Sequence, residues 1–356
     1  MLYYFGQYLQ QFWGPARLFS SFAVLIAVAL YAGFFSALTI IPKLYCLMPH
    51  DRGREFTANA AQAKGKPTGT GSIFITLFVI VCFLFIPMDL YQSLILALTW
   101  LTMLTGFLDD RSVTSWGEYR KALLDLIISV ATAFILLFWA KNSSSDGKIY
   151  FWLPFITHQV AVNEIVYIII TTIMIWASIN TTNCTDGVDG LSATLVLIAL
   201  FTLGAVLYFI MGHTNISAYL LVPHIKDGAR WGAMLFALAG VVMGYLWHNA
   251  FPSKCLMGDA GSRALGYFIG ACVMISGNPF MILATSSIIF VNGGMGLLKV
   301  ALLRFFKIKI FSKITFPLHD HMRNNKGWSP TQVLLKFVMM QILITSVLIG
   351  IFFKIR

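Results

Sequence analysis

The chain has 356 residues, of which 58% are hydrophobic and 11% are charged, whereas soluble domains carry about 25% charged residues. This composition excludes an ordinary soluble globular protein and predicts an all-α polytopic membrane protein. The net charge of +11 could indicate a nucleic-acid partner. We expect none, because basic loops on one side of a membrane and an anionic substrate explain that charge better.

Ten segments are apolar enough to be transmembrane helices, and each has roughly the 17–25 residues that a bilayer requires. They cover residues 19–44, 72–88, 91–108, 121–140, 162–180, 190–211, 229–249, 262–277, 279–305 and 330–354. Met1 to Trp13 lacks the basic and apolar regions of a cleavable signal peptide. We therefore expect a single integral-membrane domain over residues 1–356.

The loops on one side of these spans carry most of the lysines and arginines. They are residues 45–71, 109–120, 181–189, 250–261 and 306–329. The positive-inside rule places this side in the cytoplasm and both termini outside. On the opposite side, a turn signal at 143–147 and β-prone residues after Lys148 predict a small hairpin at the outer face.

The first of these loops contains Lys64-Gly-Lys-Pro-Thr-Gly-Thr-Gly-Ser72. Glycines and hydroxyls near lysines leave backbone N–H groups free to meet phosphate oxygens. Taken alone, the segment reads better as a flexible basic loop at a membrane surface.

Asp109 and Asp110 end the apolar run that starts at Leu101. A helix C-terminus disfavours anions, and adjacent carboxylates at a membrane face are costly unless a cation compensates them. A divalent metal is the obvious candidate for that cation.

Polar residues recur every third position in Asn180-Thr-Thr-Asn-Cys-Thr-Asp-Gly-Val-Asp-Gly-Leu191. The spacing predicts a polar stripe at the end of one span, and the following helix N-terminus is a natural anion site. A capped loop is the simpler alternative, because Asn, Asp and Gly all favour turns. Four amide and carboxylate groups in register favour a functional site.

Two more polar segments lie in the same set of loops. In Asn249–Ser262, Asp259 stands between glycines just before a helix, where an N-cap and a metal ligand are about equally plausible. Phe316-Pro-Leu-His-Asp-His-Met322 has two histidines around a carboxylate, without the ligand set of a zinc site.

All these carboxylates lie on the side that also holds the lysines. Carboxylates without thiolates suit Mg²⁺, and a carboxylate–metal site ringed by lysines suits phosphoryl transfer from a nucleotide diphosphate. A site at the membrane face suggests that one substrate is a lipid.

The chain resembles the bacterial phospho-N-acetylmuramoyl-pentapeptide transferases, which belong to the superfamily of polyprenyl-phosphate N-acetylhexosamine-1-phosphate transferases. The resemblance covers nearly the whole chain. It is carried by 65–71, Gly106-Phe-Leu-Asp-Asp110, 180–191, Met257-Gly-Asp-Ala-Gly-Ser262, 317–321 and Lys326-Gly-Trp-Ser-Pro-Thr-Gln-Val333.

The resemblance implies transfer of phospho-MurNAc-pentapeptide from UDP-MurNAc-pentapeptide to undecaprenyl phosphate, which yields lipid I and UMP and requires Mg²⁺. It also implies ten transmembrane helices, a cytoplasmic active site, a homodimer and a place in the bacterial cell membrane.

Individual residues can be matched to the family's motifs. Asp109 and Asp110 match its paired aspartates, Lys121 a phosphate-contacting lysine and His319 the first of three consecutive histidines. Asp259 matches the metal ligand, with Asp109 and Asp110 as further candidate ligands. The remaining expected substrate-binding residues are Lys64, Lys66, Thr68, Asn180, Asn183, Asp186, Gly187, Asp189, Asn249, Leu256, Asp320 and His321.

The chain departs from the family pattern at two points. Asp320 replaces the middle histidine, which puts that residue's role in doubt, and the lysine of the first loop can be Lys64 or Lys66. Two alternative functions stay open, namely transfer of another HexNAc-1-phosphate, such as that of UDP-GlcNAc, and ion-coupled secondary transport. Transporters place ionisable residues near the bilayer midplane, whereas here they cluster at helix ends.

Overall fold

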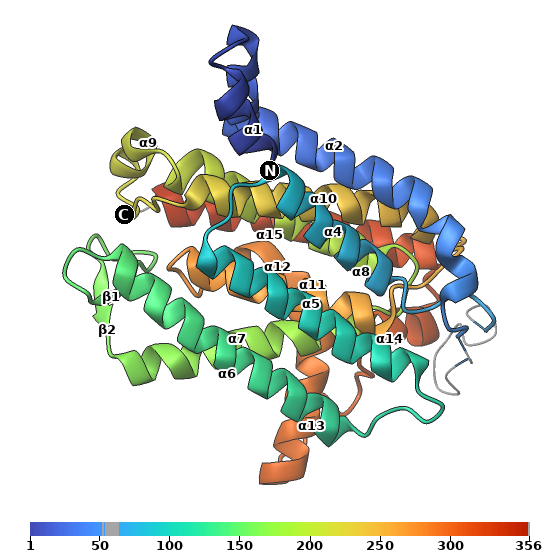
Figure 1. Ribbon diagram of the computed structural model, residues 1–356. Helices are drawn as coiled ribbons and strands as arrows, with labels where there is room; N and C mark the ends of the chain where they lie inside the picture. Colours follow the sequence, from blue (N-terminus) through green and yellow to red (C-terminus); the bar gives the residue numbers. More distant parts are fainter. Residues whose placement is uncertain (52, 54–63, 355–356) are drawn as a thin grey trace.

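A computed structural model describes residues 1–51, 53 and 64–354. It is a bundle of helices with one two-stranded sheet (Figure 1). The helices are α1 (Leu2–Leu9), α2 (Phe22–Ile40), α4 (Gly71–Phe85), α5 (Leu90–Arg111), α6 (Glu118–Ser143), α7 (Glu164–Thr185), α8 (Leu191–Ala205), α9 (Thr214–Tyr219), α10 (Gly228–Asn249), α11 (Gly258–Ile275), α12 (Met281–Ile289), α13 (Met295–Phe306), α14 (Leu318–Lys326) and α15 (Pro330–Lys354).

Shorter helical segments of other types join several of these. Two are 3₁₀ helices, η1 (Gly14–Ser20) and η2 (Pro42–Leu47). Two are π-helical, η3 (Val206–Met211) and η4 (Phe290–Gly294). Of the two π-helical segments, η3 continues α8, and η4 links α12 to α13. In Figure 1, α13 leaves the bundle at the bottom of the view.

Eight helical segments in the described part of the chain are long and apolar enough to cross a membrane. They correspond to eight of the ten predicted spans, at 22–40, 90–111, 118–143, 164–185, 191–211, 228–249, 281–306 and 330–354. The other two predicted spans coincide with α4, an apolar helix of 15 residues, and with α11, a helix of 18 residues.

The sequence explains several helix boundaries. Asp89 and Gln92 form a capping box at the start of α5, in which each side chain accepts the other's backbone N–H. Asn163 caps α7 by accepting from the N–H of Ile165 at 2.9 Å. Gly190 has a φ of +75°, which lets the chain turn sharply from α7 into α8.

The core is centred on α11, where every residue from Asp259 to Ile275 is buried. Figure 1 shows it in the middle of the bundle. Glycines let its neighbours approach closely. A Cβ on Gly71 of α4 would lie 2.0 Å from the backbone nitrogen of Gly261, and one on Gly106 of α5 would lie 2.4 Å from the carbonyl oxygen of Asp259. These contacts fix α4 and α5 against the first turn of α11.

The two ends of the bundle differ. The predicted hairpin is confirmed as antiparallel strands β1 (Ile149–Phe151) and β2 (Val160–Val162), with Tyr150 opposite Ala161. It lies with α9 at the left end of Figure 1, and α14 lies at the right end. Both chain ends reach the hairpin end, since the Met1 amino group donates to the Phe83 carbonyl and Phe353 packs on Trp152.

Candidate active site

Three helices bring Asp109, Lys121 and Asp259 together at the α14 end of the bundle. Asp109 is in the last turn of α5, and the other two are in the first turns of α6 and α11. The Lys121 ammonium lies 2.9 Å from Oδ2 of Asp259 and also forms an ion pair with Asp109. The carboxylates are 7% and 3% exposed, whereas the Lys121 side chain is 23% exposed. One accessible cation therefore bridges two buried anions.

Asp110 faces a different partner from its neighbour. Its two carboxylate oxygens accept the backbone N–H groups of Asp259 and Ala260, each at 3.0 Å. These groups belong to the first turn of α11, where a negative charge is favourable. Gly258 has a φ of +67°, and a Cβ there would lie 2.3 Å from Oδ2 of Asp110. Asp110 thus holds the start of α11, which carries Asp259.

Asp109 is also fixed by the backbone that follows it. Its Oδ1 accepts the N–H of Trp116 at 2.7 Å, so the loop between α5 and α6 folds back over the carboxylate. The other oxygen, Oδ2, is directed at Lys121. The two adjacent aspartates therefore occupy distinct positions in the site.

The first loop docks on the segment that precedes α11. Leu256 donates its N–H to the Pro67 carbonyl at 2.8 Å and accepts from Thr70 Oγ1 at 2.8 Å. Lys66 Nζ donates to Ser253 Oγ at 2.9 Å and lies 3.9 Å from Asp189. Thr68 is buried beside this contact, whereas Lys64 is exposed. Of the two candidate lysines, the structure brings Lys66 into the site.

The predicted stripe from Asn180 to Asp189 separates into two parts. Asn180 and Asn183 lie on α7, where Asn183 accepts from Ser262 Oγ of α11 at 2.8 Å. Asp186 ends the helix, and Asp189 accepts the N–H of Ser253 at 3.0 Å. The stripe thus contacts both α11 and the loop before it.

Asn249 connects two of the site's loops. Its Oδ1 accepts the N–H of Gly190 at 2.9 Å, and its Nδ2 donates to the Cys255 carbonyl at 2.8 Å. Its amide is therefore engaged in holding the loop after α7 against the loop after α10.

His319 is buried under the turn that follows α7. Its Nε2 lies 2.3 Å from the position that a Cβ on Gly187 would occupy, so only glycine fits at that point. Burial, with a smaller contribution from Arg323, lowers the pKa of His319 to about 4, and the imidazole is neutral at neutral pH.

The other two residues of this motif lie nearer the surface. An oxygen of Asp320 lies 3.7 Å from Nε2 of His319, and burial raises the pKa of Asp320 while Arg323 opposes the shift. Nδ1 of His321 accepts the backbone N–H of Thr315 at 3.3 Å. Asp320 therefore places a carboxylate next to a neutral histidine.

Three residues of the site region were not predicted from the sequence. Asn292 contacts His319 from η4, and Asp125 pairs with Arg263 below Lys121 and Asp259. The two charged residues carried a usable signal, because ionisable residues inside transmembrane helices are rare and usually functional. The π-helical turn that carries Asn292 had a weaker signal, because Gly293-Gly-Met-Gly296 in the long ninth predicted span could permit a bend but did not single out Asn292.

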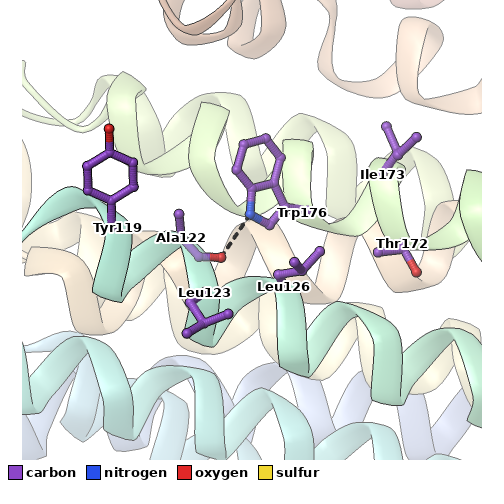
Figure 2. Close-up of a pocket in the computed structure, with 7 residues that line it drawn as sticks. All are labelled: Tyr119, Ala122, Leu123, Leu126, Thr172, Ile173 and Trp176. Carbon is purple, nitrogen blue, oxygen red and sulfur yellow. Dashed lines mark hydrogen bonds between the residues drawn. The ribbon is translucent and has the colours of Figure 1, made fainter. Parts of the chain in front are cut away.

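An apolar groove of about 570 Å³ opens between α6 and α7. Figure 2 shows its seven lining residues and the hydrogen bond of 3.1 Å from Trp176 Nε1 to the Ala122 carbonyl, which joins the two helices. The lining residues are Tyr119, Ala122, Leu123, Leu126, Thr172, Ile173 and Trp176.

Two arginines lie near the Tyr119 end of the groove. The guanidinium of Arg304, from α13, lies 5.7 Å from the centre of the Tyr119 ring, and that of Arg120 stacks on Trp116 at 3.7 Å. The groove thus begins in a basic region, two residues from Lys121.

The donor chemistry of the cluster fits a magnesium ion. Asp109 and Asp259 both direct a carboxylate oxygen at the position of a cation, which Lys121 occupies. Among the described residues, no three His, Cys, Asp or Glu side chains converge as a complete metal cage. Mg²⁺ is commonly held by only one or two carboxylates together with substrate phosphates and water.

Comparison with known proteins gives a consistent result. The model of glycosyl transferase family 4 matches residues 92–277. A phospho-N-acetylmuramoyl-pentapeptide-transferase of Treponema pallidum (strain Nichols) is 52% identical over 98% of this chain and 95% of its own. A protein of the same name from Campylobacter jejuni (strain RM1221) is 31% identical over 78% of this chain and 78% of its own. Another from Wolinella succinogenes is 29% identical over 87% of this chain and 88% of its own.

These matches confirm the resemblance inferred from the sequence motifs, and they extend over almost the whole chain. The paired aspartates, Lys121 and Asp259 all lie inside the region matched by the family model. The chain belongs to glycosyl transferase family 4 and, within it, to the phospho-N-acetylmuramoyl-pentapeptide-transferases.

Proposed function

We propose that this protein transfers phospho-MurNAc-pentapeptide from UDP-MurNAc-pentapeptide to undecaprenyl phosphate, with lipid I and UMP as products. The observation that carries the proposal is the Asp109–Lys121–Asp259 cluster in a chain that is 52% identical to a transferase of that name. Carboxylates and lysines at the mouth of apolar helices suit a reaction between a nucleotide sugar and a membrane lipid.

The reaction we propose is a single in-line displacement. An oxygen of the lipid phosphate attacks the β-phosphorus of the UDP-sugar, the bond to the bridging oxygen breaks, and UMP leaves. Asp109, held by the Trp116 N–H, positions the lipid phosphate or takes its proton. The ammonium of Lys121, which lies 2.9 Å from Asp259, binds the phosphate oxygens, and Asp110 keeps Asp259 in place.

Asp259 is the main proposed ligand of Mg²⁺, and Asp109 is a second ligand. The bound ion would neutralise charge on the pyrophosphate. A fully ionised phosphate needs little help from a base at neutral pH. Asp109→Asn is therefore expected to act mainly through positioning. The rival is a two-step route with an aspartate as covalent nucleophile, and trapping a kinetically competent phospho-aspartate would refute the single displacement.

The groove between α6 and α7 supports a position for the lipid substrate. An isoprenoid chain is apolar, like the residues that line the groove, and its phosphate would then lie near Arg120, Arg304 and Lys121. This arrangement brings the phosphate to the end of the groove nearest the carboxylates. Leu126→Trp, which fills the groove, should raise the KM for undecaprenyl phosphate without changing that for the nucleotide sugar.

We further propose that all ten predicted spans cross the bacterial cell membrane, with the site in the cytoplasm and both termini outside. The distribution of basic loops supports this orientation, as does the position of both termini at the hairpin end. A homodimer remains an expectation from the family. Cysteine labelling from outside intact cells, at Ser145 and separately at Ser312, tests the orientation, because both side chains are exposed and only the first should react.

The activity is tested with purified protein, undecaprenyl phosphate and each of two donors, UDP-MurNAc-pentapeptide and UDP-GlcNAc, with and without Mg²⁺. We expect lipid-linked product and UMP from the first donor only, and only with the metal. Preference for UDP-GlcNAc would make the protein a transferase of another HexNAc-1-phosphate. Activity that survives chelation would refute the role of the metal.

A further inference from the structure

A second ion pair lies one helical turn below the Lys121–Asp259 contact. Asp125 follows Lys121 by four residues on α6, and Arg263 follows Asp259 by four residues on α11. Nη2 of Arg263 lies 2.5 Å from Oδ1 of Asp125. The two helices thus present charges in opposite order, and each lysine or arginine meets an aspartate of the other helix.

This deeper pair is almost completely enclosed. The side chains of Arg263 and Asp125 are 1% and 2% exposed, and Nε and Nη1 of Arg263 have no hydrogen-bond partner among the described residues. Burying charges in this way often costs more free energy than the ion pair returns. Stability alone is therefore a poor reason for its presence, and a geometric role is the better explanation.

We propose that the Asp125–Arg263 pair is a positioning device for Asp259, which presupposes the function proposed above. It fixes the rotation and axial position of the first two turns of α11 relative to α6. Asp259 then meets Lys121 at 2.9 Å while its backbone N–H still reaches Asp110. The Asn180 side chain also hydrogen-bonds Asp125, which extends the restraint to α7.

The inference is tested with Arg263→Met, Arg263→Lys and the neutral double variant Asp125→Asn/Arg263→Met. Loss of the cation should lower kcat about 10- to 100-fold, with little change in the KM for the nucleotide sugar, because small displacements of a reacting group are that costly. Arg263→Lys should recover most of this loss. The matched control is Lys141→Met/Glu164→Gln, which removes an exposed ion pair between α6 and α7 and should leave kcat unchanged.

The neutral double variant separates positioning from stability. It leaves no unpaired buried charge, so it should keep a Tm close to that of the wild type and yet retain the low kcat. A double variant with wild-type kcat would overturn the inference. So would a double variant that does not fold, since the pair would then serve the fold itself.

A measurement independent of turnover separates this inference from the proposed function. Lys121 is held between two carboxylates, so a displaced Asp259 should let an acylating reagent modify Lys121 several-fold faster. Mass spectrometry of the labelled peptide gives this rate for each variant. An unchanged rate in Arg263→Met and in the double variant would contradict the positioning role, whichever donor the enzyme uses.

Discussion

Asn292 holds His319 through two hydrogen bonds to one oxygen. The backbone N–H of His319 donates to Oδ1 of Asn292 at 2.9 Å, and Nδ1 of the ring lies 3.1 Å from the same atom. Because a backbone N–H can only donate, the atom it meets must be the amide oxygen, and Nδ1 must therefore carry the ring proton. The neutral imidazole presents Nε2 as an acceptor beside Gly187.

Replacement of Asn292 should change His319 in two distinguishable ways. Asn292→Leu removes the acceptor and should lower kcat/KM by about 10- to 100-fold, as the loss of an orienting partner typically does. Asn292→Asp keeps the acceptor and adds a negative charge. It should raise the pKa of His319 and move the acid limb of the pH–rate profile to higher pH. A profile unchanged in Asn292→Asp would show that His319 does not titrate in the catalytic cycle.

The low pKa of His319 predicts a stability that depends on pH. The pKa of His319 falls from 6.5 to about 4 on folding. The unfolded chain therefore binds the proton more tightly than the folded protein does. The contribution of His319 to the free energy of unfolding is fully present above pH 6.5. It declines as the pH falls towards 4, by roughly 3 kcal/mol in all. Thermal unfolding in detergent should show this decline, and His319→Gln should reduce it. An equal decline in both proteins would assign it to other groups.

Glycine contacts with the first turns of α11 should be essential to the fold. Gly106→Ala and Gly71→Ala place a Cβ within 2.4 Å and 2.0 Å of α11 backbone atoms. Each should destabilise the protein by about 1–3 kcal/mol or more, because neither backbone can yield without moving a helix. The matched control is Gly350→Ala in α15, where a Cβ meets nothing within 4 Å. If all three variants have the same Tm, the close packing around α11 is wrong.

Substitution of the two adjacent aspartates should affect different properties of the protein. Asp110→Asn loses one of its two acceptors for the first turn of α11 and should lower stability by about 1–2 kcal/mol, like the loss of a helix cap. Asp109→Asn should change Tm less and act mainly on kcat, because the Asp109 carboxylate directs Oδ2 at the Lys121 cation in the candidate active site. Comparison of Tm and kcat for the two variants tests this division. Equal effects on both quantities would refute it.

Several residues of the candidate site stand out in the sequence because the patterns that mark them are local. Asp109 and Asp110 stand at the end of an apolar run, Asp259 stands between glycines before a helix, and both patterns are visible without a structure. The hairpin after Lys148 followed from turn residues and β-prone residues, and the positions of the eight long apolar helices followed from the length of the apolar segments.

What the sequence could not predict depends on contacts between distant segments. Nothing local distinguishes Lys66 from Lys64, and the choice follows from the contact of Lys66 with Ser253, 187 residues away. Similarly, Asp109 and Asp110 look equivalent until α11 is placed against one of them. The role of Asn292 required the π-helical turn that directs it towards His319.

The most direct test of the account is the rate of lipid-linked product formation from UDP-MurNAc-pentapeptide by the wild type, Asp259→Asn and Asp227→Asn. Asp227 pairs with Arg230 at the hairpin end and serves as the matched control. We expect the wild type to release UMP and lipid-linked product in equal amounts, and Asp227→Asn to have an unchanged rate. The rate of Asp259→Asn should be lower by a factor of about 100 or more. A wild-type rate in Asp259→Asn would contradict the proposed active site.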